Sequence, residues 1–208
     1  NTINVRSAKE KEMIVTLDEC EQKLTPDNLL ICDGDSPIAI AGIIGGNNSG
    51  VDEETKNILI ESAYFNPTNI RRSSKKLGIS TEASRRFERD TDINMLIPAL
   101  KKLAILIKDV AGGEISSNFF DIYNHKFELR EILFSIDKCN NFLGSDISLK
   151  EVKEIFKNLH IECKNKDSNL ICKIPSFRND LNREVDLYEE VARVFGYNNI
   201  KNSQYFSM

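Results

Sequence analysis

AGIIGGNNSGVDEETKNILIESAYFNPTNIRRSSKKLG, the stretch at residues 41–78, changes its pattern twice. A glycine-rich turn comes first, and NILIESAYF at 57–65 then reads as an apolar strand. Asn66 and Pro67 open a helix that Gly78 ends, because proline is favoured at the first helical position and glycine just past the last one. Turn, strand and helix in close succession predict an α+β fold.

Upstream of this stretch the chain reads as short strands separated by turns. The runs INVRSA, EMIVTL, LLICD and PIAIAG alternate with turn sequences such as TPD at 25–27 and DGDSP at 33–37. Downstream, apolar residues at 93–110 recur three and four apart as in a helix, and EISSNFFDIY at 114–123 reads as a returning strand. We therefore expect a mixed or antiparallel sheet with packed helices.

A second unit is predicted where the composition changes near Asn124. REILFSI reads as a strand, DKCNNFLG as a short helix, and Ser148 with Glu151 as the capping box of SLKEVKEIFKNLH. IECKNKDSNLICKIP reads as a β-hairpin, and REVDLYEEVARVFG as a helix that Gly196 ends. This order is compatible with a small winged-helix-like α+β domain. The predicted divisions are residues 1–124, residues 125–203 and a tail at 204–208.

The composition excludes several classes of protein. Hydrophobic residues make up 40% of the 208 residues and charged residues 29%, as in ordinary globular proteins. A net charge of −4 excludes a basic surface over the whole chain, and no apolar run approaches the roughly 20 residues of a membrane span. His125 and His160 have no partners arranged for catalysis, so we assign them no catalytic role.

The cysteine pattern suggests neither a disulfide framework nor a zinc site. The chain has five cysteines, an odd number, and no CxxC sequence. Cys163 and Cys172 can face each other across the predicted hairpin, but two free thiols are the simpler interpretation in a reducing cytosol.

Three groups of residues are candidates for chemistry, and the first combines the glycine loop at 41–46, Glu61, and Thr81-Glu82-Ala83. A glycine loop lets a ligand approach backbone N–H groups closely. A carboxylate in an apolar strand is costly unless it has a partner, so Glu61 can bind an amine or a phenol hydroxyl. The residues alone leave a tight turn, a salt-bridged glutamate and an ordinary helix cap open as the alternative.

The second group is acidic and the third is basic. Asp186, Glu189 and Glu190 share one helix face, and Asp180 precedes them at a turn. Four converging carboxylates suit Mg²⁺, although acids near a helix N-terminus also simply complement its dipole. The basic runs RRSSKK at 71–76 and RRFER at 85–89 can meet phosphates, or they form a solvated helix face with local ion pairs.

Two long runs carry a resemblance to a known family. Residues 41–92, from AGIIGG to RFERDTD, resemble the editing-domain signature of the bacterial phenylalanyl-tRNA synthetase beta subunit. PSFRNDLNREVDLYEEVARVFGYNNI at 175–200 resembles the end of the small domain that follows. The resemblance implies an internal piece of that subunit, with the C-terminal part of the editing domain (B3/B4) and the small domain (B5). Asp90 stands where the family usually has glycine, and Ile93 and Asn179 stand where it usually has proline.

The resemblance implies a cytoplasmic, heterotetrameric ligase that uses ATP and joins phenylalanine to tRNA(Phe). The alpha subunit would hold the aminoacylation site, so ATP would not bind this chain. The beta editing domain would hydrolyse mischarged Tyr-tRNA(Phe), since an apolar pocket alone discriminates poorly against an added hydroxyl. A non-catalytic module that binds nucleic acid or another subunit is the alternative function.

The resemblance also implies roles for particular residues. In the family the editing pocket is lined by the residues that match Gly42, Gly45, Glu61, Thr81 and Ala83. Glu61 would recognise the tyrosine hydroxyl, Ala83 would leave room for the ring, and the glycine-loop N–H groups would position the ester. No residue is assigned as a nucleophile, so backbone groups and the tRNA terminus would orient the water. Further pocket residues of the family, a His and an Asn or Thr, precede Asn1, so we expect an incomplete pocket.

A metal site is implied in the same way. Mg²⁺ would lie at the boundary with the alpha subunit and would be absent or weakly bound in this chain alone. Its ligands would be the residues matching four carboxylates of the family: Asp180, Asp186, Glu189 and Glu190.

Overall fold

The fold is seen in a computed structural model that describes residues 2–117, 119–123 and 126–200. The chain divides into two compact units, Asn1–Phe119 and Phe120–Met208, and each is described by itself. The predicted division between residues 124 and 125 and the predicted tail at 204–208 lie outside the described residues. No described helix is both long and apolar enough to cross a membrane.

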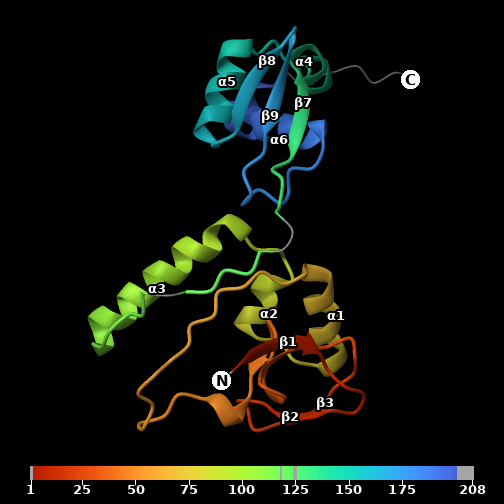
Figure 1. Ribbon diagram of the computed structural model, residues 1–208. Coiled ribbons are helices and arrows are strands. Elements are labelled where there is room, and N and C mark those ends of the chain that lie inside the picture. The colour runs from red at the N-terminus through yellow and green to blue at the C-terminus, as the bar shows by residue number, and fades with distance from the viewer. Residues whose placement is uncertain (1, 118, 124–125, 201–208) are drawn as a thin grey trace. The chain divides into compact units, whose positions relative to one another are not determined.

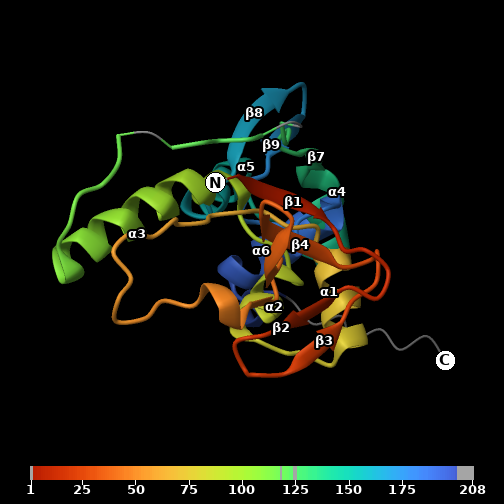
Figure 2. The same cartoon turned by 60° about the horizontal axis from the view of Figure 1, so that its bottom comes forward.

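The first unit is built on a four-stranded antiparallel sheet with the order β1-β4-β5-β6 (Figures 1 and 2). The four predicted N-terminal strand runs are confirmed, whereas the shorter β3 and β6 were not predicted. The strands are β1 (Ile3–Ser7), β4 (Leu29–Asp33), β5 (Ser36–Ile40) and β6 (Ile44–Gly45), with a separate ribbon of β2 (Met13–Val15) and β3 (Glu21–Lys23).

Helix α1 (Pro67–Leu77) begins and ends where the sequence predicts. The Asn66 side chain accepts a hydrogen bond from the N–H group of Asn69, and Gly78 ends the helix with φ +70°. Ile70 of α1 packs with Phe65 and with buried residues of the sheet to form the core of this unit. The edge of the Phe65 ring also meets Phe87 of α2 (Glu82–Phe87), with 5.0 Å between ring centroids.

Two predicted strands, at 57–65 and 114–123, do not form. Their described residues have no regular secondary structure. A strand needs a neighbour to pair its backbone groups, and the described strands provide none for either segment. Both predictions were wrong because apolar β-favouring residues do not by themselves specify a pairing partner.

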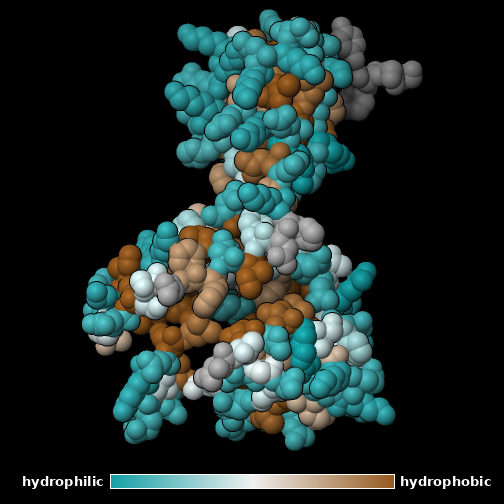
Figure 3. Space-filling model, viewed as in Figure 1, coloured by the Kyte–Doolittle hydropathy of each residue, from teal (hydrophilic) through white to brown (hydrophobic). Residues whose placement is uncertain are grey.

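The predicted helix at 93–110 forms as a short 3-10 turn, Ile93–Met95, followed by α3 (Leu96–Ala111). No residue of α3 is fully buried, and Val110 is 82% exposed. Hydrophobic residues gather at the surface over this region (Figure 3). Within the part of the chain that the structure describes, nothing covers this apolar stripe, so the expected packing of this helix against the sheet is not seen.

The turn after α2 explains how the chain accommodates Asp90 in place of glycine. Asp90 has φ +74°, in the left-handed region that glycine enters most easily. Aspartate tolerates this region better than most residues, and its Oδ1 accepts a hydrogen bond of 2.9 Å from the N–H group of Thr91. The backbone turn is therefore made by a residue other than glycine.

The second unit follows the predicted order of strand, helix, helix, hairpin and helix (Figure 1). Its antiparallel sheet has the order β7-β9-β8. Ser148 and Glu151 form the predicted capping box, and Gly144 and Gly196 end the helices that they were expected to end. The elements are β7 (Glu131–Ser135), α4 (Ile136–Leu143), α5 (Leu149–Asn158), β8 (Glu162–Lys166), β9 (Asn169–Lys173) and α6 (Glu184–Phe195).

Phe134 lies at the centre of the core of this unit and is fully buried. Its ring meets the rings of Phe156 and Tyr188 edge to face, with centroid distances of 5.0 and 5.6 Å. These contacts join β7 to α5 and α6. Since the hairpin of β8 and β9 pairs with β7, one cluster of aromatic side chains fixes the whole unit.

Candidate functional site

The glycine loop of the first unit is packed tightly against the start of α1. Gly42 has φ +66°, and a Cβ there would lie 2.7 Å from Cδ2 of Phe65 and 2.9 Å from Cδ1 of Ile70. Both the backbone conformation and the lack of space therefore require glycine. Among the described residues, the N–H group of Gly42 has no hydrogen-bond acceptor. The loop thus offers a free backbone donor held by packing.

Gly45 and Gly46 are held by the strands. The N–H group of Gly46 donates to the carbonyl oxygen of Ile38 at 2.7 Å, and Leu17 donates to the carbonyl oxygen of Gly45 at 3.0 Å. A Cβ on Gly45 would meet Cδ1 of Leu17 at 3.0 Å. These contacts fix the second half of the loop in the sheet.

Thr81 joins the glycine loop to α2. Its hydroxyl donates to the carbonyl oxygen of Ile43 at 2.6 Å and accepts from the N–H group of Ser84 at 3.0 Å. The Ser84 hydroxyl in turn accepts from the N–H group of Thr81. The side chain of Thr81 is therefore fully occupied, and it acts here as a positioning residue.

Ala83 and Glu61 remain open to solvent. Ala83 is exposed on the first turn of α2. Glu61 lies in the irregular segment before Phe65, and within the described residues its carboxylate has no hydrogen-bond or ion-pair partner. Part of the residue is accessible, yet the surrounding protein desolvates the carboxyl group and raises the pKa of Glu61. No described hydrogen bond joins Glu61 to the glycine loop.

Tyr64 is a neighbour that the sequence analysis did not single out. Burial and the nearby carboxylate of Asp90 raise the pKa of Tyr64 to about 12. The signal was present in NILIESAYF, where an aromatic hydroxyl follows Glu61 by three residues. It became meaningful only when the fold placed Asp90 beside it.

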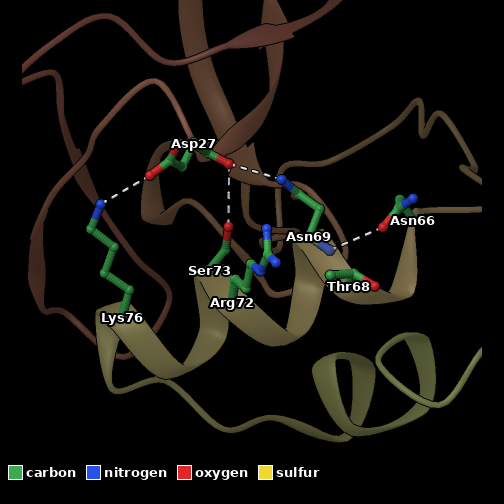
Figure 4. A pocket seen from close by; sticks show the side chains of 7 residues that line it. All are labelled: Asp27, Asn66, Thr68, Asn69, Arg72, Ser73 and Lys76. Atoms are coloured by element: carbon green, nitrogen blue, oxygen red, sulfur yellow. Dashed lines mark hydrogen bonds and ion pairs between the residues drawn. The ribbon is translucent and has the colours of Figure 1, made fainter.

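A polar hollow lies along α1, and none of the predicted editing residues lines it (Figure 4). Asp27 holds one side through three contacts: its carboxylate pairs with Lys76, and its carbonyl oxygen accepts from Asn69 and Ser73. Arg72 also lines the hollow. The residues around it are Asp27, Asn66, Thr68, Asn69, Arg72, Ser73 and Lys76.

The predicted carboxylate cluster of the second unit is bound by arginines. Arg178 donates to both oxygens of Asp180, at 2.9 and 2.6 Å, and also contacts Glu190 at 3.0 Å. Arg193 contacts Glu190 at 2.6 Å. Burial opposes ionisation of Glu190, but the hydrogen bonds from Arg193 and Arg178 outweigh it, so its pKa is lowered.

The other two acids point to different environments. Asp186 accepts hydrogen bonds from the N–H groups of Asn182 and Arg183, which lower the pKa of Asp186. It therefore caps the start of α6, which agrees with the helix-dipole interpretation. Glu189 is exposed to solvent.

Comparison with known proteins identifies both units. Residues 1–112 match the family model of the B3/4 domain, and residues 132–197 match the tRNA synthetase B5 domain. The chain is 46% identical over 199 residues to the phenylalanine–tRNA ligase beta subunit of Geobacter metallireducens, and 45% identical over 200 residues to that of Protochlamydia amoebophila. The chain belongs to the phenylalanine–tRNA ligase beta-subunit family.

The similarity covers nearly all of this chain but a small part of its relatives. In each of these two cases 95% of the chain aligns with 25% of the relative, so the chain spans about a quarter of their length. An N-terminal fragment of the phenylalanyl-tRNA synthetase beta subunit from Pyrococcus horikoshii, a solved structure, is 16% identical with a TM-score of 0.49, covering 95% of this chain and 57% of that one.

Family membership raises the question of Mg²⁺ at the four carboxylates. Among the described residues, no group of three or more His, Cys, Asp or Glu side chains is arranged to hold a metal ion. As arranged, the carboxylates do not fit Mg²⁺, because Arg178 and Arg193 occupy Glu190 and backbone N–H groups occupy Asp186. A site shared with an alpha subunit stays a prediction, and we derive no step from it.

The arginine network makes a stability prediction. Glu190→Gln should destabilise the second unit by about 2 kcal/mol, because two arginines lose a charged acceptor. Glu189→Gln, one residue away on the same helix and exposed, should change the free energy of unfolding by less than about 0.5 kcal/mol. Urea unfolding followed through the NMR amide signals of α6 measures both. Equal losses in the two variants would show that the network contributes nothing specific.

Proposed function

We propose that this chain serves in a phenylalanine–tRNA ligase beta subunit. It would assemble with an alpha subunit in the cytoplasm and contribute to charging of tRNA(Phe) by the holoenzyme, which uses ATP at a site outside this chain. The first unit would contribute to hydrolytic editing of Tyr-tRNA(Phe). The family match to both units supports this assignment.

The observation that carries the editing proposal is the bond between Thr81 and the carbonyl oxygen of Ile43. It holds α2, with Ala83 on its first turn, against the glycine loop at a length of 2.6 Å. The free N–H group of Gly42 lies on that loop. Backbone donors held in place can bind an ester carbonyl without reorganising.

Glu61 would supply the recognition of tyrosine. Its carboxyl group has no partner among the described residues, and desolvation raises its pKa. A partly desolvated group that lacks a partner gains most when a ligand hydroxyl approaches. Phenylalanine offers no hydroxyl, so the site would distinguish the two amino acids at this one atom. Ala83 would leave space for the ring because its side chain is a single methyl group.

No side chain of the glycine loop can act as a nucleophile. We propose that water attacks the ester carbonyl while backbone N–H groups of the loop stabilise the developing oxyanion. The tRNA terminus would then accept or relay the proton as its hydroxyl leaves. In this scheme the protein positions the ester and selects tyrosine, and it supplies no covalent intermediate.

The editing proposal is tested in the assembled enzyme. Glu61→Ala should slow hydrolysis of Tyr-tRNA(Phe) roughly 5- to 150-fold, the equivalent of about 1–3 kcal/mol for one lost hydrogen bond. Phenylalanine charging should be unchanged. Ala83→Trp should also slow hydrolysis, by filling the space for the ring. Single-turnover deacylation of Tyr-tRNA(Phe) measures both effects.

Glu54→Ala is the matched control, because Glu54 is an exposed acid in the preceding loop. It should leave hydrolysis unchanged. If Glu61→Ala edited at the normal rate, Glu61 would not be the tyrosine-recognition residue. If neither variant had any effect while the chain still bound tRNA, the alternative of a non-catalytic binding module would stand in place of the editing role.

A further inference from the structure

Helix α1 carries a local positive charge in an acidic chain. Between residues 66 and 89 the sequence has seven basic and two acidic residues, a net charge of +5, whereas the whole chain carries −4. Four of the bases are on α1, which has no acidic residue: Arg71, Arg72, Lys75 and Lys76. All four are exposed. Such a concentration of one charge on one helix needs a physical explanation.

Local ion pairs account for little of this charge. Lys76 pairs with Asp27 at 3.1 Å, but both side chains are more than half exposed. Within the described residues, Arg71, Arg72 and Lys75 have no side-chain hydrogen-bond or ion-pair partner. The interpretation of α1 as a solvated face with local ion pairs therefore holds for one of its four cations.

The helix geometry places these cations in two rows. Thr68, Arg72 and Lys76 follow one another at intervals of four residues, about 6 Å apart along the axis, and Arg71 and Lys75 form a parallel row. The opposite side of α1 packs into the unit through Ile70, Ser73 and Ser74, which are buried. The rows cannot turn inward, so they are a fixed surface.

The hollow in Figure 4 adjoins the first of these rows. Asn69 and Ser73 bind the carbonyl oxygen of Asp27 and hold the 25–28 turn against the helix. The carboxylate of Asp27, the one anion among the lining residues, is paired with Lys76. This leaves the charge of Arg72 uncompensated on the wall of a concave polar surface.

We propose that α1 binds the phosphate backbone of RNA, with Arg71, Arg72 and Lys75 as phosphate-contacting residues and Thr68 as an additional hydrogen-bond donor. The hollow has no apolar side chain in its lining, whereas the core of a protein interface is apolar and depleted in charge. Arginine presents a planar fork that matches phosphate oxygens. A strand of phosphates therefore fits this surface better than a protein partner does.

The inference rests on the proposed function, because an editing domain must hold the tRNA whose terminus it hydrolyses. It adds a site that is separate from the glycine loop and Glu61. Phosphate contacts orient a nucleic acid without reading its sequence. The role of α1 would be to align the acceptor strand so that the ester reaches the loop.

Binding of an unacylated tRNA(Phe) transcript to the 208-residue chain tests the proposal without hydrolysis. The double variant Arg71→Gln/Arg72→Gln should bind at least about fivefold more weakly at 150 mM salt, and the dependence of log K on log salt should become shallower by roughly two contacts. The matched control is Lys150→Gln/Lys157→Gln on α5, where the bases alternate with Glu151 and Glu154. The control should bind as the unaltered chain does.

Three results would overturn the proposal: an unchanged affinity and salt dependence, an equal loss in the α5 control, or displacement of the RNA by polyglutamate as readily as by polyuridylate. In the assembled enzyme the α1 variant should raise KM for Tyr-tRNA(Phe) and leave kcat unchanged. A failure of hydrolysis with normal RNA binding would contradict the editing role and leave the α1 site intact. Circular dichroism checks that the variants fold.

An independent observation concerns two cysteines of the second unit. Cys163 of β8 and Cys172 of β9 are partners in the antiparallel register, and their sulfur atoms are 3.4 Å apart. Counting from the closing pair of the hairpin, Lys166 and Asn169, they form a pair without mutual backbone hydrogen bonds. Opposite Cα atoms in such a pair are about 4.5 Å apart, within the range of about 4.4–6.8 Å for disulfides.

The geometry points to a dithiol site that two-electron oxidants of the peroxide class convert to a disulfide. The Cys163 thiolate attacks the peroxide, forming a sulfenic acid and releasing hydroxide. The Cys172 sulfur then attacks the Cys163 sulfur, its proton leaves with the hydroxyl as water, and the disulfide forms. Two thiols and one hydrogen peroxide thus give one disulfide and two waters.

Accessibility assigns the order of these two steps. Cys163 is partly exposed and Cys172 is fully buried. The hydrogen bond from the Cys172 thiol lowers the pKa of Cys163, which increases its thiolate fraction. Among the remaining cysteines, Cys32 and Cys139 are buried and Cys20 is exposed.

Peptide mapping of the Cys20→Ser chain after one equivalent of hydrogen peroxide tests this site. Trypsin cuts between the two cysteines, so the peptides 158–164 and 167–173 should be recovered joined, and dithiothreitol should separate them. With Cys172→Ala, Cys163 should instead be trapped as a sulfenic acid by dimedone. Oxidation of Cys163 without a linked peptide in the Cys20→Ser chain would overturn the proposal, as would recovery of both thiols unreacted.

Discussion

The first unit depends on the hydrogen bond between the Thr81 hydroxyl and the carbonyl oxygen of Ile43. The bond joins segments far apart in the sequence, the glycine loop and the start of α2. On the other side of the loop, Gly42 lies against Phe65 and Ile70 with no space for a Cβ. The loop is therefore held between α2 and the start of α1. A free backbone donor on a loop held in this way has the rigidity that ester recognition requires.

Charge follows a different arrangement in each unit. In the second unit, carboxylates and arginines compensate each other locally, and Glu190 is buried with two arginine contacts. In the first unit, the cations of α1 are in excess and largely unpaired. Paired charges stabilise a fold, whereas unpaired charges on a fixed surface attract a ligand of opposite sign. The acidic composition of the whole chain hides this contrast.

Elements with a local cause were predictable from the sequence. The helix from Pro67 to Leu77 and the capping box of Ser148 and Glu151 depend on residues within a few positions of one another. The strands at 57–65 and 114–123 were wrong because pairing depends on partners distant in sequence. The left-handed turn at Asp90 was hidden in the same way, since aspartate is tolerated there but does not demand it.

The candidate site was predictable only in part. The family resemblance supplied Gly42, Thr81 and Glu61 as candidates, and the structure joins the loop to Thr81 without a described bond to Glu61. The acidic motif was read without the arginine inside it. Arg178 stands two residues before Asp180, and its reach to Glu190 became evident only when the turn and α6 were folded together.

Amide hydrogen exchange in Thr81 variants tests the central claim most directly. Thr81→Ser retains the hydroxyl and should preserve protection at Gly46 in the loop and at Ser84 in α2, whereas Thr81→Val removes it. The account predicts that Thr81→Val speeds exchange at both Gly46 and Ser84, since the one hydroxyl serves both elements. Faster exchange at Ser84 alone, with Gly46 as protected as before, would show that the glycine loop is held without Thr81 and would contradict the account.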